Sequence, residues 1–525
     1  MKMMPSFFRV LLWYVFLEQV SNNGIEKVVF RGAHKNGILI NPIMRKIKFL
    51  IFFYMTVFFV SCNIQVQRLA LHPENPHYFI FRGKPVVLIG STEHYGAVMN
   101  LDFDYVAYLD QLAADGLNIT RTFTGIYREQ KTSFGITNNT LAPDSGRYIC
   151  PWAQSNQPGY INGGNKYDLS RWDNAYFKRL KDFIAQAGKR GIIVELDLFS
   201  NYYSNQQWNW SPLYHANNIN GIGKVDDHKE VLSLKHPEIL VVQESMVKKI
   251  VDELHNFDNL YYEVCNEPYF GDIDALEAWE QHMTEIISKA EKGYKNKHLI
   301  SQNIANYKKV VKNPNPNVSI FNFHYARPPE TIKLNYGLNK PIGDNETGFK
   351  GTFDYPYRAE AWDFLIAGGA LYNNLDYSFT TGYEDGTFHF PKTQPGGGGI
   401  VLRNQLKILK DFINNLDFIH MKPANELIKE FLADSSTVRV LAKPGETYAI
   451  YINRFVGDKS ILSRRLPRSA TMQMELPAAS YSLEWMDVET GNIVKTEKVI
   501  HPGGMKQILS PEYMLDILLR IKKTL

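Results

Sequence analysis

One stretch of sequence decides how this chain folds: Leu260-Tyr261-Tyr262-Glu263-Val264-Cys265-Asn266-Glu267-Pro268. Its first six residues have the apolar and aromatic character of a short strand. The strand therefore carries the tripeptide Asn-Glu-Pro at its carboxyl end. A second stretch, Lys340-Pro341-Ile342-Gly343-Asp344-Asn345-Glu346-Thr347-Gly348, carries another glutamate in the same way. The pair is informative because this chain of 525 residues alternates strands and helices throughout its middle part.

Strand-like runs and amphipathic helices continue on both sides of the first stretch. The helical segments, such as 103–114 and 238–254, have apolar residues that recur at spacings of three and four. The strand-like runs are 85–90, 118–123, 192–199, 260–265, 298–302, 318–324, 341–345 and 370–377. Eight such runs with helical crossovers predict an α/β fold, a (β/α)8 TIM barrel over residues 75–420. A doubly wound open sheet is the alternative, but it would need a glycine-rich phosphate loop after an early strand, and the sequence has none.

The two glutamates follow the fourth and the seventh of these runs. In an α/β barrel the functional groups lie at the carboxyl ends of the strands, so Glu267 and Glu346 can face each other across the mouth. Two carboxylates placed in this way suit cleavage of a glycosidic bond: one protonates the leaving oxygen, and the other attacks the anomeric carbon or activates water. Asp344 is a rival to Glu346, because strand alternation puts both side chains on one face. Glu346 is preferred because it is nearer the end of the strand.

Residues 75–420 resemble the clan A glycoside hydrolases, the cellulase- and mannanase-like barrels, in the Asn-Glu-Pro at strand four and the glutamate at strand seven. The resemblance implies that Glu267 is the acid/base and Glu346 the nucleophile of a retaining, two-glutamate double displacement on a β-linked glycan. It also implies that Glu267 starts protonated, with a pKa raised by the cleft and by the neighbouring anion.

The resemblance further implies five substrate-binding or supporting residues near the strand ends. Arg121, after strand two, can hold the nucleophile ionised, and Asn266 can bond the sugar 2-hydroxyl. His324 and Tyr325 end strand six, where a histidine or tyrosine commonly touches the nucleophile. His94 follows strand one and is predicted to contact the sugar.

Other residues near the predicted cleft admit two interpretations. The clan often has a tryptophan at strand eight, whereas residues 376–379 of this chain read Asp-Tyr-Ser-Phe. The long loop after strand three contains Trp208 and Trp210, which we expect to stack on pyranose rings; alternatively, the loop packs on its own rings. Glu195 and Asp197 on strand three are either polar residues of the barrel interior or sugar contacts.

The amino-terminal segment has the pattern of a secretory signal. Met44-Arg45-Lys46-Ile47-Lys48 is a basic region, an apolar run of 12 residues ends at Val60, and Ser61-Cys62 follows. The run is too short for an ordinary membrane-spanning helix. Cys62 resembles the acylated cysteine of the lipobox in bacterial lipoproteins, although Phe59 stands where leucine is usual. An uncleaved anchor and a plain signal peptide remain alternatives.

This interpretation sets the remaining boundaries and the location. Residues 1–43 lie upstream of the natural start, residues 44–62 form the lipoprotein signal, and residues 63–74 form a tether. We therefore expect an exported protein with a lipid anchor in a bacterial outer membrane. Residues 78–89 predict a hairpin with its turn at Gly83.

Composition excludes several classes of function. Residues 1–61 contain eight basic and two acidic residues, so without them the net charge is −2 instead of +4, and nucleic acid is not expected as a partner. Of three cysteines, only Cys150 and Cys265 would remain after lipidation of Cys62. The sequence has no CxxC or HxxxH spacing, so we expect no metal and no cofactor.

Residues 421–525 have a different texture, with short alternating runs separated by turns such as Lys443-Pro444-Gly445-Glu446. They predict a small all-β sandwich that serves as an accessory domain. The sequence as a whole predicts a lipid-anchored retaining glycoside hydrolase. The alternative is a non-catalytic glycan-binding lipoprotein on a hydrolase-like barrel, and the presence of both glutamates disfavours it. An esterase is disfavoured because the Gly-x-Ser-x-Gly motif is missing.

Overall fold

The computed structural model of the protein describes residues 68–295, 297–433, 435–454 and 466–524. The predicted signal peptide, Cys62 and the first part of the predicted tether lie outside these ranges. Within them, none of the helices combines the length and apolar character that a membrane crossing requires.

The described part of the predicted tether belongs to a sheet. β1 (Ala70–Leu71) pairs antiparallel with β2 (Phe79–Phe81), which pairs with β3 (Lys84–Val86). The backbone groups of this segment are therefore engaged by a hairpin, and Leu69 is buried. The prediction of a free tether is wrong for this part, whereas the hairpin with its turn at Gly83 is confirmed, with a φ of 77° at that glycine.

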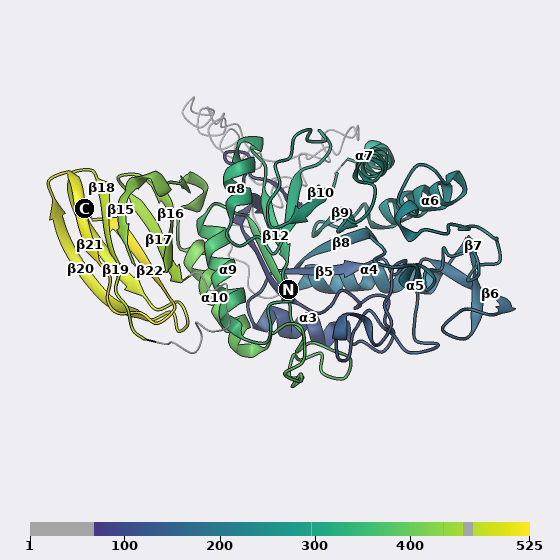
Figure 1. Cartoon of the computed structure of the whole chain (residues 1–525). Helices are drawn as coiled ribbons and strands as arrows, with labels where there is room; N and C mark the ends of the chain where they lie inside the picture. The colour runs from purple at the N-terminus through teal and green to yellow at the C-terminus, as the bar shows by residue number, and fades with distance from the viewer. Residues whose placement is uncertain (1–67, 296, 434, 455–465, 525) are drawn as a thin grey trace, which may run out of the picture. The chain divides into compact units, whose positions relative to one another are not determined.

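Eight parallel strands form a nearly closed barrel (Figure 1), which confirms the predicted fold class. Each predicted run overlaps one barrel strand, except that the run 85–90 is divided between β3 and the first barrel strand. The barrel strands are β4 (Leu88–Thr92), β5 (Ile119–Phe123), β8 (Ile193–Ser200), β9 (Leu260–Asn266), β10 (Ile300–Asn306), β11 (Ile320–His324), β12 (Ile342–Glu346) and β13 (Leu371–Leu375).

One residue, Asn118, connects the first two strands of the barrel through its backbone and its side chain. Asn118 donates its backbone N–H to Ile89 O at 3.1 Å and accepts from Ile89 N at 2.8 Å through its amide oxygen. Seven of the eight strands are buried along their whole length, because side chains fill the interior and helices cover the outside. Only β10 is partly exposed.

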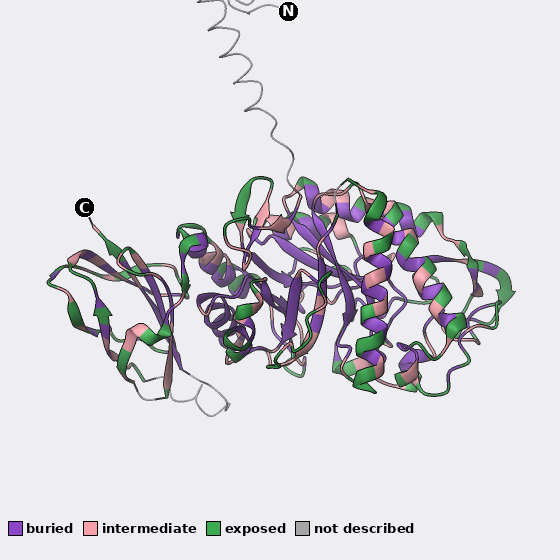
Figure 2. Cartoon of the chain, turned by 90° about the horizontal axis from the view of Figure 1, so that it is seen from above, coloured by how far each residue is buried: buried purple, intermediate pink, exposed green. Residues whose placement is uncertain are grey.

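Most of the helices pack around the barrel with one buried and one exposed face, as Figure 2 shows, whereas α9 has no exposed residue. Asp104, Asp173 and Asp272 precede three of them, and their carboxylates accept hydrogen bonds from first-turn N–H groups. The helices are α3 (Tyr105–Ala114), α4 (Asn174–Lys189), α5 (Asn205–Trp208), α6 (Pro237–Leu254), α7 (Ile273–Ala290), α8 (Glu330–Asn335), α9 (Asp354–Ile366) and α10 (Ile400–Asn414). Single 3₁₀ turns lie at 133–135, 228–230, 291–293, 336–338, 418–420 and 425–427.

An antiparallel hairpin interrupts the barrel pattern between β5 and α4. It consists of β6 (Trp152–Pro158) and β7 (Asn165–Trp172), and the sequence did not predict it. Trp152 and Trp172 stack at its base, with ring centroids 6.2 Å apart.

The C-terminal residues form two antiparallel sheets, which confirms the predicted all-β domain. One sheet has the strand order β14-β16-β17-β22-β19-β20 and the other β15-β18-β21, around a core that includes Tyr448 and Trp485. The strands are β14 (Lys422–Pro423), β15 (Ile428–Leu432), β16 (Ser436–Lys443), β17 (Thr447–Arg454), β18 (Thr471–Leu476), β19 (Ala479–Met486), β20 (Ile493–His501), β21 (Gly504–Leu509) and β22 (Asp516–Lys523).

The C-terminal sheets contact the barrel through α9. Trp362 stacks on Tyr451 with ring centroids 5.6 Å apart. Arg358 donates two hydrogen bonds to the carboxylate of Asp516, at 3.0 and 2.8 Å, and both side chains are buried. Tyr451 and Leu518 belong to the same apolar cluster as the barrel core, so the two parts share buried surface.

Candidate active site

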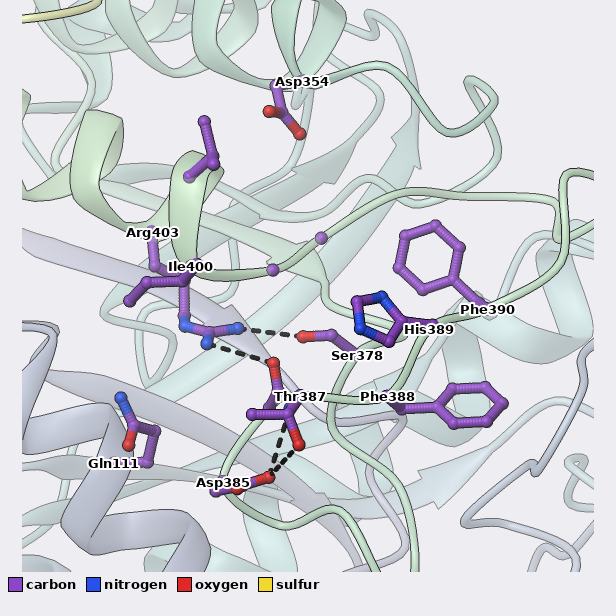
Figure 3. A pocket seen from close by; sticks show the side chains of 14 residues that line it. Gln111, Asp354, Ser378, Asp385, Thr387, Phe388, His389, Phe390, Ile400 and Arg403 are labelled. Atoms are coloured by element: carbon purple, nitrogen blue, oxygen red, sulfur yellow. Dashed lines mark hydrogen bonds between the residues drawn. The ribbon is translucent and has the colours of Figure 1, made fainter.

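Among the cavities of the described residues, one lies beyond the carboxyl end of the last barrel strand and another lies where the carboxyl ends of several barrel strands meet. The first has a volume of about 550 Å³ and is lined by Asp354, Asp385, Phe388, His389 and residues of the α10 amino terminus (Figure 3). The second is a cavity of about 70 Å³ that both Glu267 and Glu346 line. The chemistry predicted from the sequence therefore belongs to the smaller cavity, called the cleft below.

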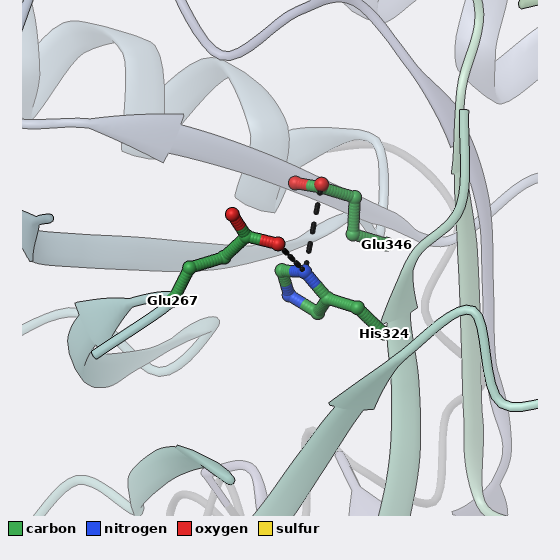
Figure 4. Close-up of side chains that lie close together, drawn as sticks. All are labelled: Glu267, His324 and Glu346. Atoms are coloured by element: carbon green, nitrogen blue, oxygen red, sulfur yellow. Dashed lines mark hydrogen bonds and ion pairs between the residues drawn. The ribbon is translucent and has the colours of Figure 1, made fainter. Parts of the chain in front are cut away.

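Glu267 and Glu346 face each other in the cleft on either side of a histidine (Figure 4). His324 is the last residue of β11, and its Nδ1 lies 3.0 Å from Glu267 Oε1 and 3.5 Å from Glu346 Oε1. One oxygen of each carboxylate and a nitrogen of this ring all lie within 4.8 Å of one another. This spacing fits the separation of about 5 Å that retaining glycosidases have between their two carboxyl groups.

A β-bulge in β12 separates Asp344 from Glu346. Phe323 pairs with Asp344 and the next residue of β11 pairs with Glu346, so Asn345 has no pairing partner. Asp344 is fully buried, and burial together with the charge of Glu360 on α9 raises its pKa well above the ordinary value. Glu346 lines the cleft instead. The prediction that the two carboxylates share a face is wrong, because the extra residue reverses the alternation.

The backbone at Glu267 is in a conformation that few residues adopt. Its φ is +51°, in the left-handed region, and such positions concentrate at functional sites. The backbone N–H of Glu267 donates to Asn303 Oδ1 at 3.1 Å. Its carboxylate accepts from Tyr203 at 2.6 Å and from Tyr269 at 3.0 Å, in addition to His324. These contacts fix both the chain direction and the side chain.

The pKa of Glu267 differs from the expectation. Burial alone would raise it, but the hydrogen bond and charge of His324, with help from Tyr203 and Tyr269, outweigh burial, so the pKa of Glu267 lies below its ordinary value. Burial lowers the pKa of His324, but the charge of Glu346 and the contact with Glu267 raise it overall. The predicted rise in the pKa of Glu267 is therefore not found in the free protein, because the contact with His324 lowers this pKa instead.

Glu346 accepts hydrogen bonds from three surrounding donors. Its Oε2 accepts from Tyr95 at 2.9 Å and from Arg121 Nη1 at 3.0 Å, and its Oε1 accepts from Tyr325 at 3.3 Å. The guanidinium also lies over the ring of Tyr95, 4.6 Å from its centroid. A carboxylate with a cation and two hydroxyl donors around it is well placed to act as an anion.

Arg121 joins the cleft to the polar interior of the barrel. It is 1% exposed, and its nitrogens donate to Glu195 at 2.7 Å, Asp197 at 2.7 Å, Glu263 at 2.9 Å and Asn266 at 2.9 Å. Glu195 and Asp197 are fully buried beneath the cleft, which agrees with their interpretation as residues of the barrel interior.

Among the residues that the structure describes, two groups of side chains have ligand atoms close enough to hold a metal ion: Glu267 with His324 and Glu346, and Glu195 with Asp197 and Glu263. In the second group the Arg121 guanidinium already provides the positive charge. In the first group His324 donates to a carboxylate, and further hydrogen bonds from tyrosines and Arg121 engage both glutamates. We assign no metal to either group.

The structure brings most of the predicted site residues together. His94, Asn266 and Tyr325 line the cleft with the two glutamates, and Arg121 and His324 contact them directly. The sequence analysis missed the other lining residues, which are Tyr95, Phe123, Tyr127, Glu129, Phe134, Leu141, Tyr203 and Phe349. Most of these lie in loops after the strands, where periodicity carries no signal.

The two predicted stacking tryptophans are not in the cleft. Trp208 is 1% exposed, and its Nε1 donates to Val225 O at 3.2 Å. Tyr202 and Tyr214 pack against its ring. Trp210 lies against the guanidinium of Arg128, 4.9 Å from the ring centroid. The prediction that these rings bind sugar in the cleft is therefore wrong: the loop buries Trp208 against its own side chains, and Trp210 packs half-buried on Arg128 of another loop and does not line the cleft.

Comparison with known proteins agrees with this geometry. Residues 82–332 match the profile of the family described as cellulase, glycosyl hydrolase family 5. No curated protein matches the chain.

Among solved structures, a putative glycoside hydrolase from Bacteroides vulgatus has a TM-score of 0.61 at 16% identity, over 88% of this chain and 83% of that one. A family 5 glycoside hydrolase from the same organism has a TM-score of 0.55 at 13% identity, over 87% and 93%. A third structure, named glycoside hydrolase, has a TM-score of 0.58 at 14% identity, over 87% and 97%. At these identities the likeness concerns the fold.

The family match covers the first six barrel strands, including β9 with its Asn-Glu-Pro, and the remaining two strands complete the same barrel. Residues 82–332 thus match the cellulase family, glycosyl hydrolase family 5, and the protein is a glycoside hydrolase with a TIM barrel followed by C-terminal β-sheets.

Proposed function

We propose that the protein cleaves β-glycosidic bonds with retention of configuration, with Glu346 as the nucleophile and Glu267 as the acid/base. The observation that carries this proposal is the pair of facing carboxylates, which lie within 4.8 Å of each other at the carboxyl end of the barrel. Each accepts from two tyrosines, but their charged neighbours differ: Glu346 accepts from Arg121, whereas Glu267 accepts from His324. The difference supports two distinct roles.

In the first step Glu346 attacks the anomeric carbon and forms a glycosyl ester, while Glu267 gives a proton to the leaving oxygen. The proton passes from His324 Nδ1 to the Glu267 carboxylate along their 3.0 Å hydrogen bond. In the second step Glu267 takes a proton from water as the water oxygen attacks the anomeric carbon and releases Glu346, and this proton then returns to His324 Nδ1. Asn266 contacts the sugar near the bond that breaks.

The substrate is a β-linked poly- or oligosaccharide, and the protein reaches it from a membrane surface. Cys62 carries the lipid in this proposal, which rests on the sequence pattern of residues 44–62 alone. Growth with a radiolabelled fatty acid should label the wild type, and Cys62→Ser should abolish the label. Label retained in that variant would exclude this anchor.

The mechanism is tested by incubation with a panel of activated 2-deoxy-2-fluoro glycosides, followed by intact mass measurement and peptide mapping. We expect a stable adduct on Glu346, and the sugar that reacts narrows the substrate. An adduct on Asp344 would transfer the nucleophile role to that residue. The absence of labelling across the panel, combined with glycan binding in calorimetry, would favour a non-catalytic binding protein on a hydrolase-like barrel.

A further inference from the structure

A third carboxyl group lines the cleft and has no role in the mechanism above. Glu129 lies in the loop after β5, lines the same cavity as Glu267 and Glu346, and is 3% exposed. Its backbone N–H donates to Leu141 O at 2.9 Å, so a neighbouring part of the same loop holds it in place. The cleft therefore contains three glutamates, of which the two-carboxylate reaction uses two.

Glu129 belongs to a row of hydrogen-bonded side chains along one wall of the cleft, and the donor and acceptor of each hydrogen bond can be assigned. Tyr127 donates to its Oε1 at 2.9 Å, and Asn139 donates to its Oε2 through the amide nitrogen. The amide oxygen of Asn139 lies 3.0 Å from His94 Nδ1. Because an amide oxygen only accepts, the hydrogen of the His94 ring must be on Nδ1.

The direction of these bonds leaves acceptors facing the cleft. Burial lowers the pKa of His94 to about 4, so its ring is neutral and Nε2 has a free lone pair. Each oxygen of Glu129 accepts one hydrogen bond from the protein and can accept another. His94 and Glu129 thus present two acceptors on one wall, spaced by the amide of Asn139.

Glu129 has no cation beside it among the described residues. The adjacent Arg128 turns away and donates to Pro143 O at 2.9 Å and to Tyr160 at 3.2 Å. Burial raises the pKa of Glu129 to about 7, and the charge of Glu346 contributes to the rise. A buried carboxyl group without a counter-charge is costly, and here the fold does not use it to hold backbone.

Glu93 shows what a purely structural glutamate looks like in the same region. It is also fully buried, but its carboxylate accepts from the backbone N–H groups of Gly96 and Ala97 at 3.0 Å and from Thr140 at 2.6 Å. It does not line the cleft. Glu129 differs in both respects, because it accepts only from side chains and faces the cavity.

We propose that Glu129 is a further sugar-binding residue of this site: beside His94, whose sugar contact the sequence already predicts, it binds a second hydroxyl group of an uncharged sugar and disfavours acidic glycans. The hydroxyl groups donate to His94 Nε2 and to the free lone pairs of Glu129. Uronic acids are rejected because the described lining of the cleft has three glutamates and no lysine or arginine, and Arg121 behind it is engaged by four acidic residues. This inference rests on the proposed function for the identity of the ligand as a glycan.

The test measures binding, so that turnover does not enter it. Glu267→Gln serves as the background, and calorimetry measures its affinity for neutral, cationic and anionic ligands: cellotetraose, mannotetraose, a chitosan tetramer and a β-linked glucuronic acid tetramer. Glu129→Ala is then added, with Glu129→Gln as a second variant that preserves shape. We expect at least one neutral tetramer to bind, and Glu129→Ala to weaken it by about 10- to 100-fold, as the loss of a hydrogen bond to a buried polar group does.

Glu280→Gln is the matched control. Glu280 on α7 is also a buried carboxyl group with a strongly raised pKa, but it accepts from Gln302 and lies away from the cleft. It should leave the affinity unchanged, and thermal melting should show that all variants fold. Unchanged affinity in Glu129→Ala, tighter binding of the glucuronic acid tetramer than of the neutral tetramers, or no binding of any tetramer would each overturn the inference.

The outcome is separable from that of the mechanism. If no fluoro glycoside labels the protein but Glu129→Ala still weakens glycan binding, catalysis fails and this inference stands. If Glu346 is labelled but Glu129→Ala binds normally, the mechanism stands and this inference fails.

Discussion

At the scale of single residues, His324 links the two glutamates of the cleft. Its Nδ1 lies 3.0 Å from Glu267 Oε1 and 3.5 Å from Glu346 Oε1. This contact lowers the pKa of Glu267 and raises that of His324. In the proposed mechanism, an acid with a lowered pKa needs a neighbour that supplies its proton when substrate binds, and His324 has the position for it.

Replacement of His324 should therefore raise the pKa of Glu267. In His324→Asn the burial of the Glu267 carboxyl group is no longer outweighed, so this group should protonate at a higher pH than in the wild type. Carbon-13 NMR of labelled glutamate carboxyl groups, assigned with Glu267→Gln, measures the change. His298→Asn is the control, because it removes a similarly buried His–Glu contact, with Glu291, that is remote from the cleft. An unchanged or lower pKa in His324→Asn would contradict the prediction.

The sequence predicted the residues that end strands and missed those in loops. Glu267, Glu346, Arg121 and His324 each lie at a place where a strand-like run stops, and the barrel rule then puts them together. Glu129 and Tyr203 gave no such signal, because a loop's path depends on contacts that are distant in sequence. The tryptophans were wrongly predicted for the same reason.

At the scale of elements, the barrel strands were readable because each is a short apolar run. The β12 bulge was not readable, since it arises from the pairing of β12 with β11 and not from the sequence of β12 alone. The β6–β7 hairpin was missed because its strands are mostly polar, for example Gln154-Ser155-Asn156-Gln157 in β6. Packed aromatic rings at its base stabilise this hairpin, and its strands do not show the alternation of apolar and polar residues on which strand prediction depends.

The loop that follows β4 should make stability depend on pH through Glu93. Burial raises the pKa of Glu93 to about 7, above its ordinary value of 4.5, so the folded state holds the proton more tightly than the unfolded state. Protonated Glu93 therefore adds on the order of 3 kcal/mol to the free energy of unfolding below about pH 4.5. This contribution is lost as pH rises to about 7. Glu93→Gln removes the titrating group.

Urea unfolding at pH 5 and pH 8 measures the effect. The free energy of unfolding of Glu93→Gln minus that of the wild type should be larger at pH 8 than at pH 5, so the variant should be relatively more stable at pH 8. An equal difference at the two pH values would show that this carboxyl group does not titrate in the range.

At the scale of the whole molecule, the C-terminal sheets are part of the barrel's own packing. Trp362 of α9 stacks on Tyr451, and Arg358 forms a buried ion pair with Asp516. The sequence predicted an all-β domain after residue 420, because turns separate its short alternating runs. It could not show that the domain shares a core with the barrel, since the contacts join α9 to strands far away in the sequence.

Arg358→Ala should destabilise the whole protein. It leaves the carboxylate of Asp516 buried without its cation, which costs about 3 kcal/mol or more. Urea unfolding should show a single transition at lower denaturant, because the two parts share one core. Lys131→Ala is the control: its ion pair with Asp144 is exposed, so the loss should be below about 1 kcal/mol. Two separate transitions in Arg358→Ala would contradict a shared core in the wild type.

The small size of the cleft has a consequence for the speed of the reaction. Its volume of about 70 Å³ is far below the roughly 300 Å³ of a typical small-molecule pocket. The rings of Phe134 and Phe349 line it and touch each other, with centroids 6.2 Å apart. We therefore predict that the two loops that carry these rings separate when a sugar binds. The rate of glycan cleavage should then respond to the viscosity of the solvent, because friction slows moving loops but not bond breaking.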